Sequence, residues 1–160
     1  MATPYTEVLV FACNWDGWSC IETAANLGVC YPASVKVVRV SCLSRIHAGL
    51  ILKAFEFGAD GVMLLGCEPG RCHFGVDGEY IINEYEKARS ILEMLGMRKD
   101  RVALVQSPAF NGHEFVMRVM SFIVEVERLL ASKRAKIIGP GPAQDITVLS
   151  HSQLAIEKGR

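Results

Sequence analysis

The chain has 160 residues with 17 basic and 17 acidic side chains, so its formal net charge is zero. Apolar residues make up 51% of it, too many for a disordered chain, and the length suits one compact domain. Zero net charge without a polybasic run argues against nucleic-acid binding, which needs a basic face. No stretch reaches the roughly 18 uninterrupted apolar residues of a membrane helix, and the first residues lack the features of a signal peptide.

Four short β-rich segments alternate with four segments of helical periodicity. The expected strands are apolar almost throughout, as in strands buried on both faces, and span residues 7–13, 35–42, 61–67 and 101–107. The expected helices span residues 20–27, 44–57, 83–95 and 114–131. This alternation predicts right-handed β-α-β crossovers, and therefore an α/β, three-layer, flavodoxin-like or Rossmann-like domain with a four-stranded parallel sheet.

The end of the chain has a different character. Several basic residues precede the sequence Gly139-Pro140-Gly141-Pro142, which cannot continue a helix. We therefore expect one α/β domain over residues 1–134, followed by an extended C-terminal tail over residues 135–160.

Six cysteines are the most informative feature of the composition. We expect a cytoplasmic protein, and thiols stay reduced there, so metal or redox chemistry is a better explanation than disulfides. Cys13, Cys42 and Cys67 each end a predicted strand, and Cys72 follows after a Pro-Gly turn. Ligands of open parallel sheets bind outside the carboxyl ends of the strands. We therefore expect these four thiols to meet in one pocket.

Four converging thiolates suit more than one chemistry. They match the ligand set of a [2Fe–2S] cluster, and they suit a structural zinc ion equally well. A third possibility is a thiol enzyme that uses one strand-end cysteine of low pKa. No Gly-x-Gly-x-x-Gly sequence follows the first strand, which disfavours dinucleotide binding. We assign packing roles to the remaining two cysteines, Cys20 and Cys30.

The segments around the four cysteines resemble one known family. Phe-Ala-Cys-Asn-Trp at residues 11–15, Val-Ser-Cys at residues 40–42 and Gly-Cys-Glu-Pro-Gly-Arg-Cys-His at residues 66–73 are similar to the methyl-viologen-reducing hydrogenase delta subunit. The last of these segments is similar to that family's Gly-Cys-x-x-x-x-Cys-His signature. The resemblance covers roughly residues 7–130.

This resemblance implies an iron–sulfur α/β domain with no catalytic residues and with one [2Fe–2S] cluster on Cys13, Cys42, Cys67 and Cys72. It further implies that electrons pass between a hydrogenase, a formate dehydrogenase or a similar oxidoreductase and an FAD-containing, heterodisulfide reductase A-like subunit. Related assemblies place the same module beside methylenetetrahydrofolate reductase-type flavoenzymes. Many relatives have a further cysteine where this chain has Asp16, so either the four thiols suffice or Cys20 replaces it. A zinc-stabilised protein-interaction module is the alternative function.

Overall fold

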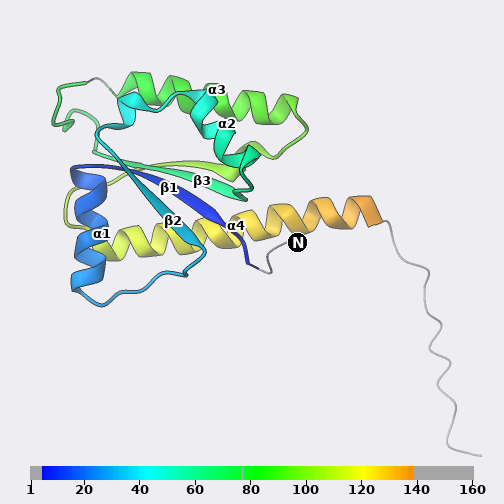
Figure 1. Ribbon diagram of the computed structural model, residues 1–160, viewed down its shortest axis with the longest axis horizontal. Helices are drawn as coiled ribbons and strands as arrows, with labels where there is room; N and C mark the ends of the chain where they lie inside the picture. Colours follow the sequence, from blue (N-terminus) through cyan, green and yellow to red (C-terminus); the bar gives the residue numbers. More distant parts are fainter. Residues whose placement is uncertain (1–4, 77, 139–160) are drawn as a thin grey trace, which may run out of the picture.

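The computed structural model describes residues 5–76 and 78–138, with side chains as far as residue 132. Its centre is one sheet of four parallel strands in the order β2-β1-β3-β4, which confirms the predicted fold class (Figure 1). The strands are β1 (Val8–Cys13), β2 (Val35–Val40), β3 (Gly61–Gly66) and β4 (Val102–Gln106). Every residue of β3 is buried, as expected for a central strand covered by helices on both faces.

Helices cover the two faces of the sheet in pairs, which makes the fold three-layered (Figure 1). One face carries α1 (Asp16–Asn26) and α4 (Gly112–Ile138). The other face carries α2 (Ala48–Glu56) and α3 (Glu79–Met94). Two short 3-10 turns complete the described elements, η1 (Leu43–Arg45) after β2 and η2 (Lys99–Arg101) before β4.

Alternation along β1 divides the core into two layers. Val8, Val10 and Ala12 pack with α1 and α4, whereas Phe11 and Cys13 pack with α2 and α3. This is the period of two that a strand imposes on its side chains. The side chain of Cys13 therefore lies on the face of the sheet that α2 and α3 cover.

Several predicted boundaries were wrong. The first helix begins at Asp16 rather than at residue 20, and the third begins at Glu79 rather than at residue 83. The second is split, because η1 and an extended Ile46 precede α2. Local propensity says little about such starts, because packing against the sheet fixes them.

The last helix continues farther than predicted. Because α4 ends at Ile138, residues 135–138 of the expected tail are helical. Residues 139–160 lie outside the described part of the chain, so the extended tail stays a prediction for them. Within the described ranges, no helix combines the length and the apolar character that a membrane crossing demands.

Candidate metal centre

The order of the strands places a crevice at the carboxyl edge of the sheet. The chain passes from β1 to β2 on one side and then to β3 on the other side of β1. Such a reversal of direction separates the loops that follow the two neighbouring strands, and ligands of open α/β sheets bind there. Here β1 ends at Cys13, and the adjacent β3 ends one residue before Cys67.

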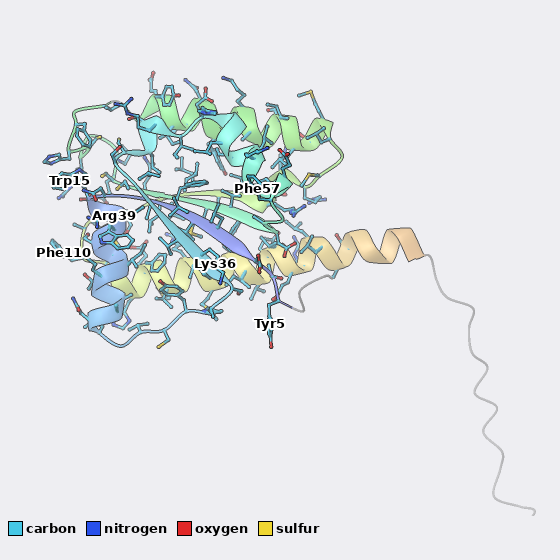
Figure 2. The ribbon with its side chains drawn as sticks, viewed as in Figure 1. Tyr5, Trp15, Lys36, Arg39, Phe57 and Phe110 are labelled. Carbon is cyan, nitrogen blue, oxygen red and sulfur yellow. The ribbon has the colours of Figure 1, made fainter. Side chains whose placement is uncertain are left out.

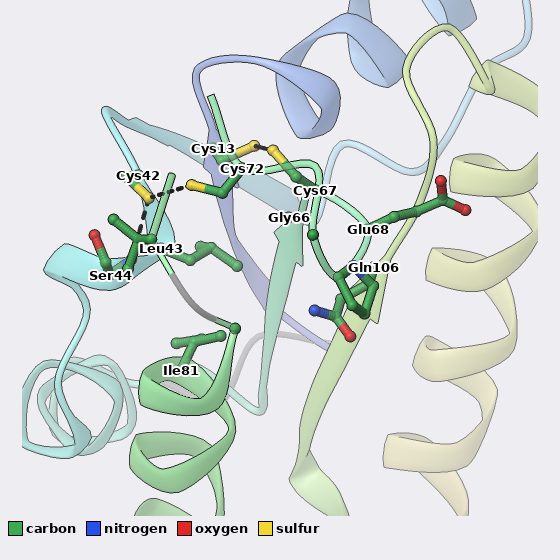
Figure 3. A pocket seen from close by; sticks show the side chains of 14 residues that line it. Cys13, Cys42, Leu43, Ser44, Gly66, Cys67, Glu68, Cys72, Ile81 and Gln106 are labelled. Carbon is green, nitrogen blue, oxygen red and sulfur yellow. Dashed lines mark hydrogen bonds between the residues drawn. The ribbon is translucent and has the colours of Figure 1, made fainter. Parts of the chain in front are cut away.

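All four predicted site cysteines line one pocket of about 50 Å³ at this edge (Figure 3). Cys13 is the last residue of β1, and Cys42 directly precedes η1. Cys67 and Cys72 belong to the segment between β3 and α3. The structure therefore brings together residues that lie far apart in sequence, and their role as metal ligands stays a prediction. The remaining lining comes from the segments that follow β2 and β3, from Ile81 in the first turn of α3 and from Gln106 at the end of β4.

The four sulfur atoms are arranged as two close pairs (Figure 3). The Sγ atoms of Cys13 and Cys67 are 3.5 Å apart, and those of Cys42 and Cys72 are 3.7 Å apart. Two thiolates on one tetrahedral metal ion, with bonds of about 2.3 Å, lie about 3.8 Å apart. Each pair thus has the separation of two ligands of a single ion. Across the described ranges, no group of three or more His, Cys, Asp or Glu side chains is arranged to hold a metal ion.

Backbone N–H groups point at the sulfur of every one of these cysteines. The N–H of Gly17 donates to Cys13 over 3.2 Å, and the N–H of Ser44 approaches Cys42 at 3.5 Å. The N–H of Asp16 donates to Cys67. Cys72 accepts from the N–H groups of two residues that follow it, Phe74 and Val76. Donors of this kind stabilise negative charge on sulfur, whether it belongs to a free thiolate or to a metal–thiolate group.

The pKa values of Cys67 and Cys72, one from each pair, shift in opposite directions. Burial raises the pKa of Cys67 to about 12, and the neighbouring Cys13 adds to this effect, although the N–H of Asp16 opposes it. Burial by itself would raise the pKa of Cys72 as well. The hydrogen bonds that Cys72 accepts from Phe74, Val76 and the Cys42 thiol outweigh burial, so the pKa of Cys72 is lowered. In the metal-free chain, Cys72 therefore ionises more readily than Cys67. Metal binding displaces such protons, so affinity for a metal rises with pH.

Two glycines allow the backbone to come close enough to form this site. A Cβ atom on Gly17 would lie 2.5 Å from the carbonyl oxygen of Leu65, so only glycine lets the first turn of α1 approach β3. A Cβ atom on Gly66 would lie 2.5 Å from Cδ1 of Leu43. Both positions are therefore places where the chain needs a residue without a side chain.

The structure places Cys20, the cysteine considered as a replacement for the missing one, outside the lining of the pocket. It lies on α1 in the core layer between the sheet and α4, away from the pocket lining. Its thiol donates to the carbonyl oxygen of Pro108 over 3.2 Å, and burial raises its pKa. Cys30 is exposed and donates weakly to the carbonyl oxygen of Gly28. Thus Cys20 is a buried core residue as expected, whereas Cys30 has no packing role.

Sequence reasoning missed two features of the site. The first is the set of N–H donors, for which Gly17 directly after the Cys-Asn-Trp-Asp segment was the available signal. The second is an aromatic stack between Trp15, two residues after Cys13, and His73, directly after Cys72; their rings lie 3.5 Å apart and nearly parallel. The edge of Phe74 contacts both rings. Residue spacing predicts that these two loops lie at the same edge of the sheet, but it gives no sign that the two rings stack.

The fold and the pocket together define an α/β protein of Rossmann-like architecture with a four-cysteine site at the switch point of its sheet. Residues 8–129 match the family described as methyl-viologen-reducing hydrogenase, delta subunit. The chain belongs to this family. The match spans all four strands, all four cysteines and most of α4.

Individual relatives agree with this assignment. The chain is 36% identical over 109 residues to the iron-sulfur D subunit of the F420-non-reducing hydrogenase vhc of Methanococcus voltae, which covers 68% of this chain and 76% of that protein. It is 31% identical over 123 residues to the iron-sulfur D subunit of the F420-non-reducing hydrogenase of Archaeoglobus profundus, covering 77% of this chain and 90% of the relative. The names of both relatives describe iron–sulfur subunits of a hydrogenase.

A third relative is a much longer protein. The chain is 28% identical over 123 residues to the A subunit of the ferredoxin:CoB-CoM heterodisulfide reductase of Methanosarcina mazei. This match covers 76% of the chain but only 15% of the relative. A domain similar to this chain is therefore one part of that longer reductase polypeptide.

Proposed function

We propose that this chain is an electron-transfer subunit that carries one [2Fe–2S] cluster on Cys13, Cys42, Cys67 and Cys72. In this proposal it relays electrons between a hydrogenase, a formate dehydrogenase or a similar oxidoreductase and an FAD-containing, heterodisulfide reductase A-like subunit. Methylenetetrahydrofolate reductase-type flavoenzymes are further candidate partners. The chain works in the cytoplasm, performs no bond chemistry itself, and needs no general acid or base.

The arrangement of the sulfurs as two pairs is the observation that carries the proposal. A [2Fe–2S] cluster with four cysteine ligands takes two thiolates at each iron, and the two pairs have the separations that this requires. Cys13 and Cys67 would hold one iron, and Cys42 and Cys72 the other. A single zinc ion instead requires four thiolates around one centre, so two separate pairs favour the cluster over the zinc-stabilised module.

The surroundings of the pocket also suit a redox group. When bound, a [2Fe–2S] cluster supplies a site that takes up and releases one electron. The N–H groups of Asp16, Gly17 and Ser44, together with those that reach Cys72, favour the added negative charge and so raise the reduction potential. They belong to short turns and a helix start, which keep the surroundings of the sulfurs rigid.

The choice of partner is supported by the long relative. A domain similar to this chain is built into the A subunit of a heterodisulfide reductase, where covalent linkage keeps it close to the rest of that protein. We infer that the separate chain meets the equivalent partner through a non-covalent contact. The names of the hydrogenase subunits support the electron donor in the same way.

Anaerobic purification of the full chain tests the proposal. We expect brown protein with about two iron and two sulfide per chain, and an electron paramagnetic resonance signal after reduction with dithionite. Cys42→Ser is expected to abolish the signal, whereas Cys20→Ser, which changes a thiol outside the pocket, is expected to leave it unchanged. Colourless protein that contains one zinc ion per chain would establish the zinc-stabilised module instead. Iron-free, zinc-free protein with a reactive thiol would favour a thiol enzyme.

A further inference from the structure

Three large aromatic side chains are exposed around the cysteine pocket. They are Trp15, Phe74 and Phe110, with exposed fractions of 39%, 55% and 76%, and we call them the aromatic rim. Each comes from a different loop, after β1, β3 and β4 respectively, so all three belong to the carboxyl edge of the sheet. Figure 2 shows Trp15 and Phe110 at the same end of the molecule, close to α1.

Phe110 is held in an unfavourable backbone conformation. Its φ angle is +64°, in the left-handed region, and it is the only described residue other than glycine with a positive φ. A phenylalanine there carries the steric cost of its Cβ, which glycine would avoid. Its ring is exposed and therefore gains little from packing inside the chain. Such a cost without an internal gain is typical of a residue that acts at a functional surface.

The loop that carries Phe110 is also fixed in place. The N–H of Phe110 donates to Oγ of Ser19 over 3.1 Å, and the Ser19 hydroxyl donates to the carbonyl oxygen of Asp16 over 2.8 Å. The same Asp16 donates its own N–H to Cys67. A short chain of hydrogen bonds therefore connects the exposed ring to the wall of the pocket. The ring is presented in a defined position beside the site.

In the loop after β3, Phe74 is fixed by its ring contacts. Its edge packs against Trp15 and His73, whose rings stack on each other. The N–H of Phe74 donates to Cys72, so the residue that carries this ring is attached directly to the site. Exposed aromatic rings of this kind, rigid and close to a functional centre, are the residues that dominate binding energy at protein interfaces.

We propose that the aromatic rim is the docking surface for the heterodisulfide reductase A-like flavoprotein. This inference rests on the proposed function, because it is electron exchange that requires a partner to cover the pocket edge. A domain similar to this chain shares one polypeptide with that reductase in Methanosarcina mazei, which supports this choice of partner. Docking through the rim brings the cofactor of the partner to the loops that carry the four cysteines.

Phe57, an exposed aromatic residue outside the rim, lies at the wrong end for this purpose. It is 80% exposed and follows the last residue of α2. Because this helix runs antiparallel to the strands, its end lies at the amino edge of the sheet (Figure 2). A six-residue strand is about 20 Å long, so a partner seated at that edge stays distant from the pocket. Phe57 therefore provides a matched control of the same residue type and exposure.

The test measures binding of the full, iron-loaded chain to the purified heterodisulfide reductase A-like flavoprotein of the same organism by anaerobic calorimetry. Phe110→Gly suits the left-handed backbone and so preserves the fold, and Phe74→Ala keeps the N–H that reaches Cys72. We expect each to raise Kd at least tenfold, equal to about 1.4 kcal/mol, while Phe57→Ala stays within twofold of the unchanged chain. The paramagnetic signal and the reduction potential of Phe110→Gly and Phe57→Ala are expected to match those of the unchanged chain.

Other outcomes separate this inference from the proposed function. If both rim variants bind as tightly as the unchanged chain, or if the unchanged chain does not bind the flavoprotein, the docking surface is wrong even when the iron content is as proposed. The rim could instead hold two copies of the chain together. A dimer that the Phe110→Gly substitution dissociates would show this and would overturn the proposed docking surface. Iron-free protein that still binds the flavoprotein through the rim keeps the docking surface and overturns only the cluster.

Discussion

The Sγ atoms of Cys13 and Cys67 lie 3.5 Å apart, although 54 positions separate the two residues in sequence. The adjacent parallel strands β1 and β3 bring them together, because Cys13 ends β1 and Cys67 directly follows the end of β3. The second pair, Cys42 and Cys72, is formed by loops instead, and its sulfurs are 3.7 Å apart. The first pair thus follows from the strand order, whereas the second depends on the conformations of the loops after β2 and β3.

This pairing predicts which disulfides form when the metal-free chain is oxidised. Thiol–disulfide exchange favours sulfurs that are already close, so mild treatment with diamide is expected to link Cys13 to Cys67 and Cys42 to Cys72. Mass spectrometry of the digested, non-reduced protein identifies the linked peptides. Cys67→Ser is expected to leave Cys13 unpaired and to preserve the other link. A majority of Cys13–Cys42 or Cys67–Cys72 links would contradict the pairing.

Gly17 is expected to be indispensable for the first pair. In Gly17→Ala the new Cβ would meet the carbonyl oxygen of Leu65 at 2.5 Å and Sγ of Cys13 at 3.3 Å, so α1 has to move away. We expect the free energy of unfolding to fall by about 1–3 kcal/mol, as for other overpacked sites. The hydrogen bond from the N–H of Gly17 to Sγ of Cys13 lengthens as well. Because this hydrogen bond favours the reduced cluster, the reduction potential of the iron-loaded chain is expected to fall.

Gly78→Ala is the matched control for this substitution. Gly78 also lines the pocket, but a Cβ there meets nothing closer than Nε2 of Gln106 at 3.8 Å, an ordinary contact. Its φ of −65° suits alanine. Urea denaturation and redox titration of both variants give the comparison. Equal losses of stability in the two variants would show that the close approach of α1 to β3 has no special importance.

Alkylation is expected to separate the six cysteines into three classes. Cys30 is exposed and should react first with iodoacetamide in the native, iron-loaded chain. The four pocket thiols should react only after the metal is removed. Cys20 should resist in both states, because it is fully buried and burial raises its pKa.

The raised pKa of Cys20 also gives a direction for the pH dependence of stability. The folded chain keeps this proton to a higher pH than the unfolded chain does. Its contribution to stability is therefore complete below the pKa of the unfolded thiol and is lost as the pH rises through the folded value. We expect Cys20→Ala to weaken the alkaline loss of stability in the metal-free chain, measured by urea denaturation at several pH values. Rapid alkylation of Cys20 near neutral pH would contradict its burial.

Much of the fold follows from local sequence patterns. The four strands read as apolar segments because both faces of the sheet are covered, and that requirement acts on every residue of a strand such as β3. The positions of Cys13, Cys42 and Cys67 at strand ends then predict one shared edge without further information. Local patterns do not give the order of the strands, and it is this order that makes Cys13 the neighbour of Cys67.

Other features of the site depend on contacts that no local pattern encodes. The start of α1 at Asp16 is set by packing of Gly17 on Leu65, a contact between segments far apart in the chain. The stack of Trp15 on His73 depends on the conformations of two loops. The left-handed backbone of Phe110 runs against the residue's own preference, so propensity predicts the opposite conformation. These are the features in which function, or tertiary packing, outweighs local preference.

Arg101 is expected to contribute strongly to stability from the opposite edge of the sheet. Its side chain is only 12% exposed, and it donates to the carbonyl oxygens of Asp60 and Ala59. Burial lowers its pKa, while the nearby Asp60 carboxylate opposes this effect.

Arg101→Ala leaves two carbonyl groups and a carboxylate without this partner, so we expect a loss of about 2–4 kcal/mol in the free energy of unfolding. Arg128→Ala is the control, because its ion pair with Glu125 is largely exposed to solvent, so we expect it to leave the free energy of unfolding nearly unchanged. Thermal unfolding of the two variants measures both losses of stability. Neither variant should change the iron content, because Arg101 lies at the far end of the strands from the cysteines. Equal and small losses for both would show that the hydrogen bonds of Arg101 are exchanged for water without net cost.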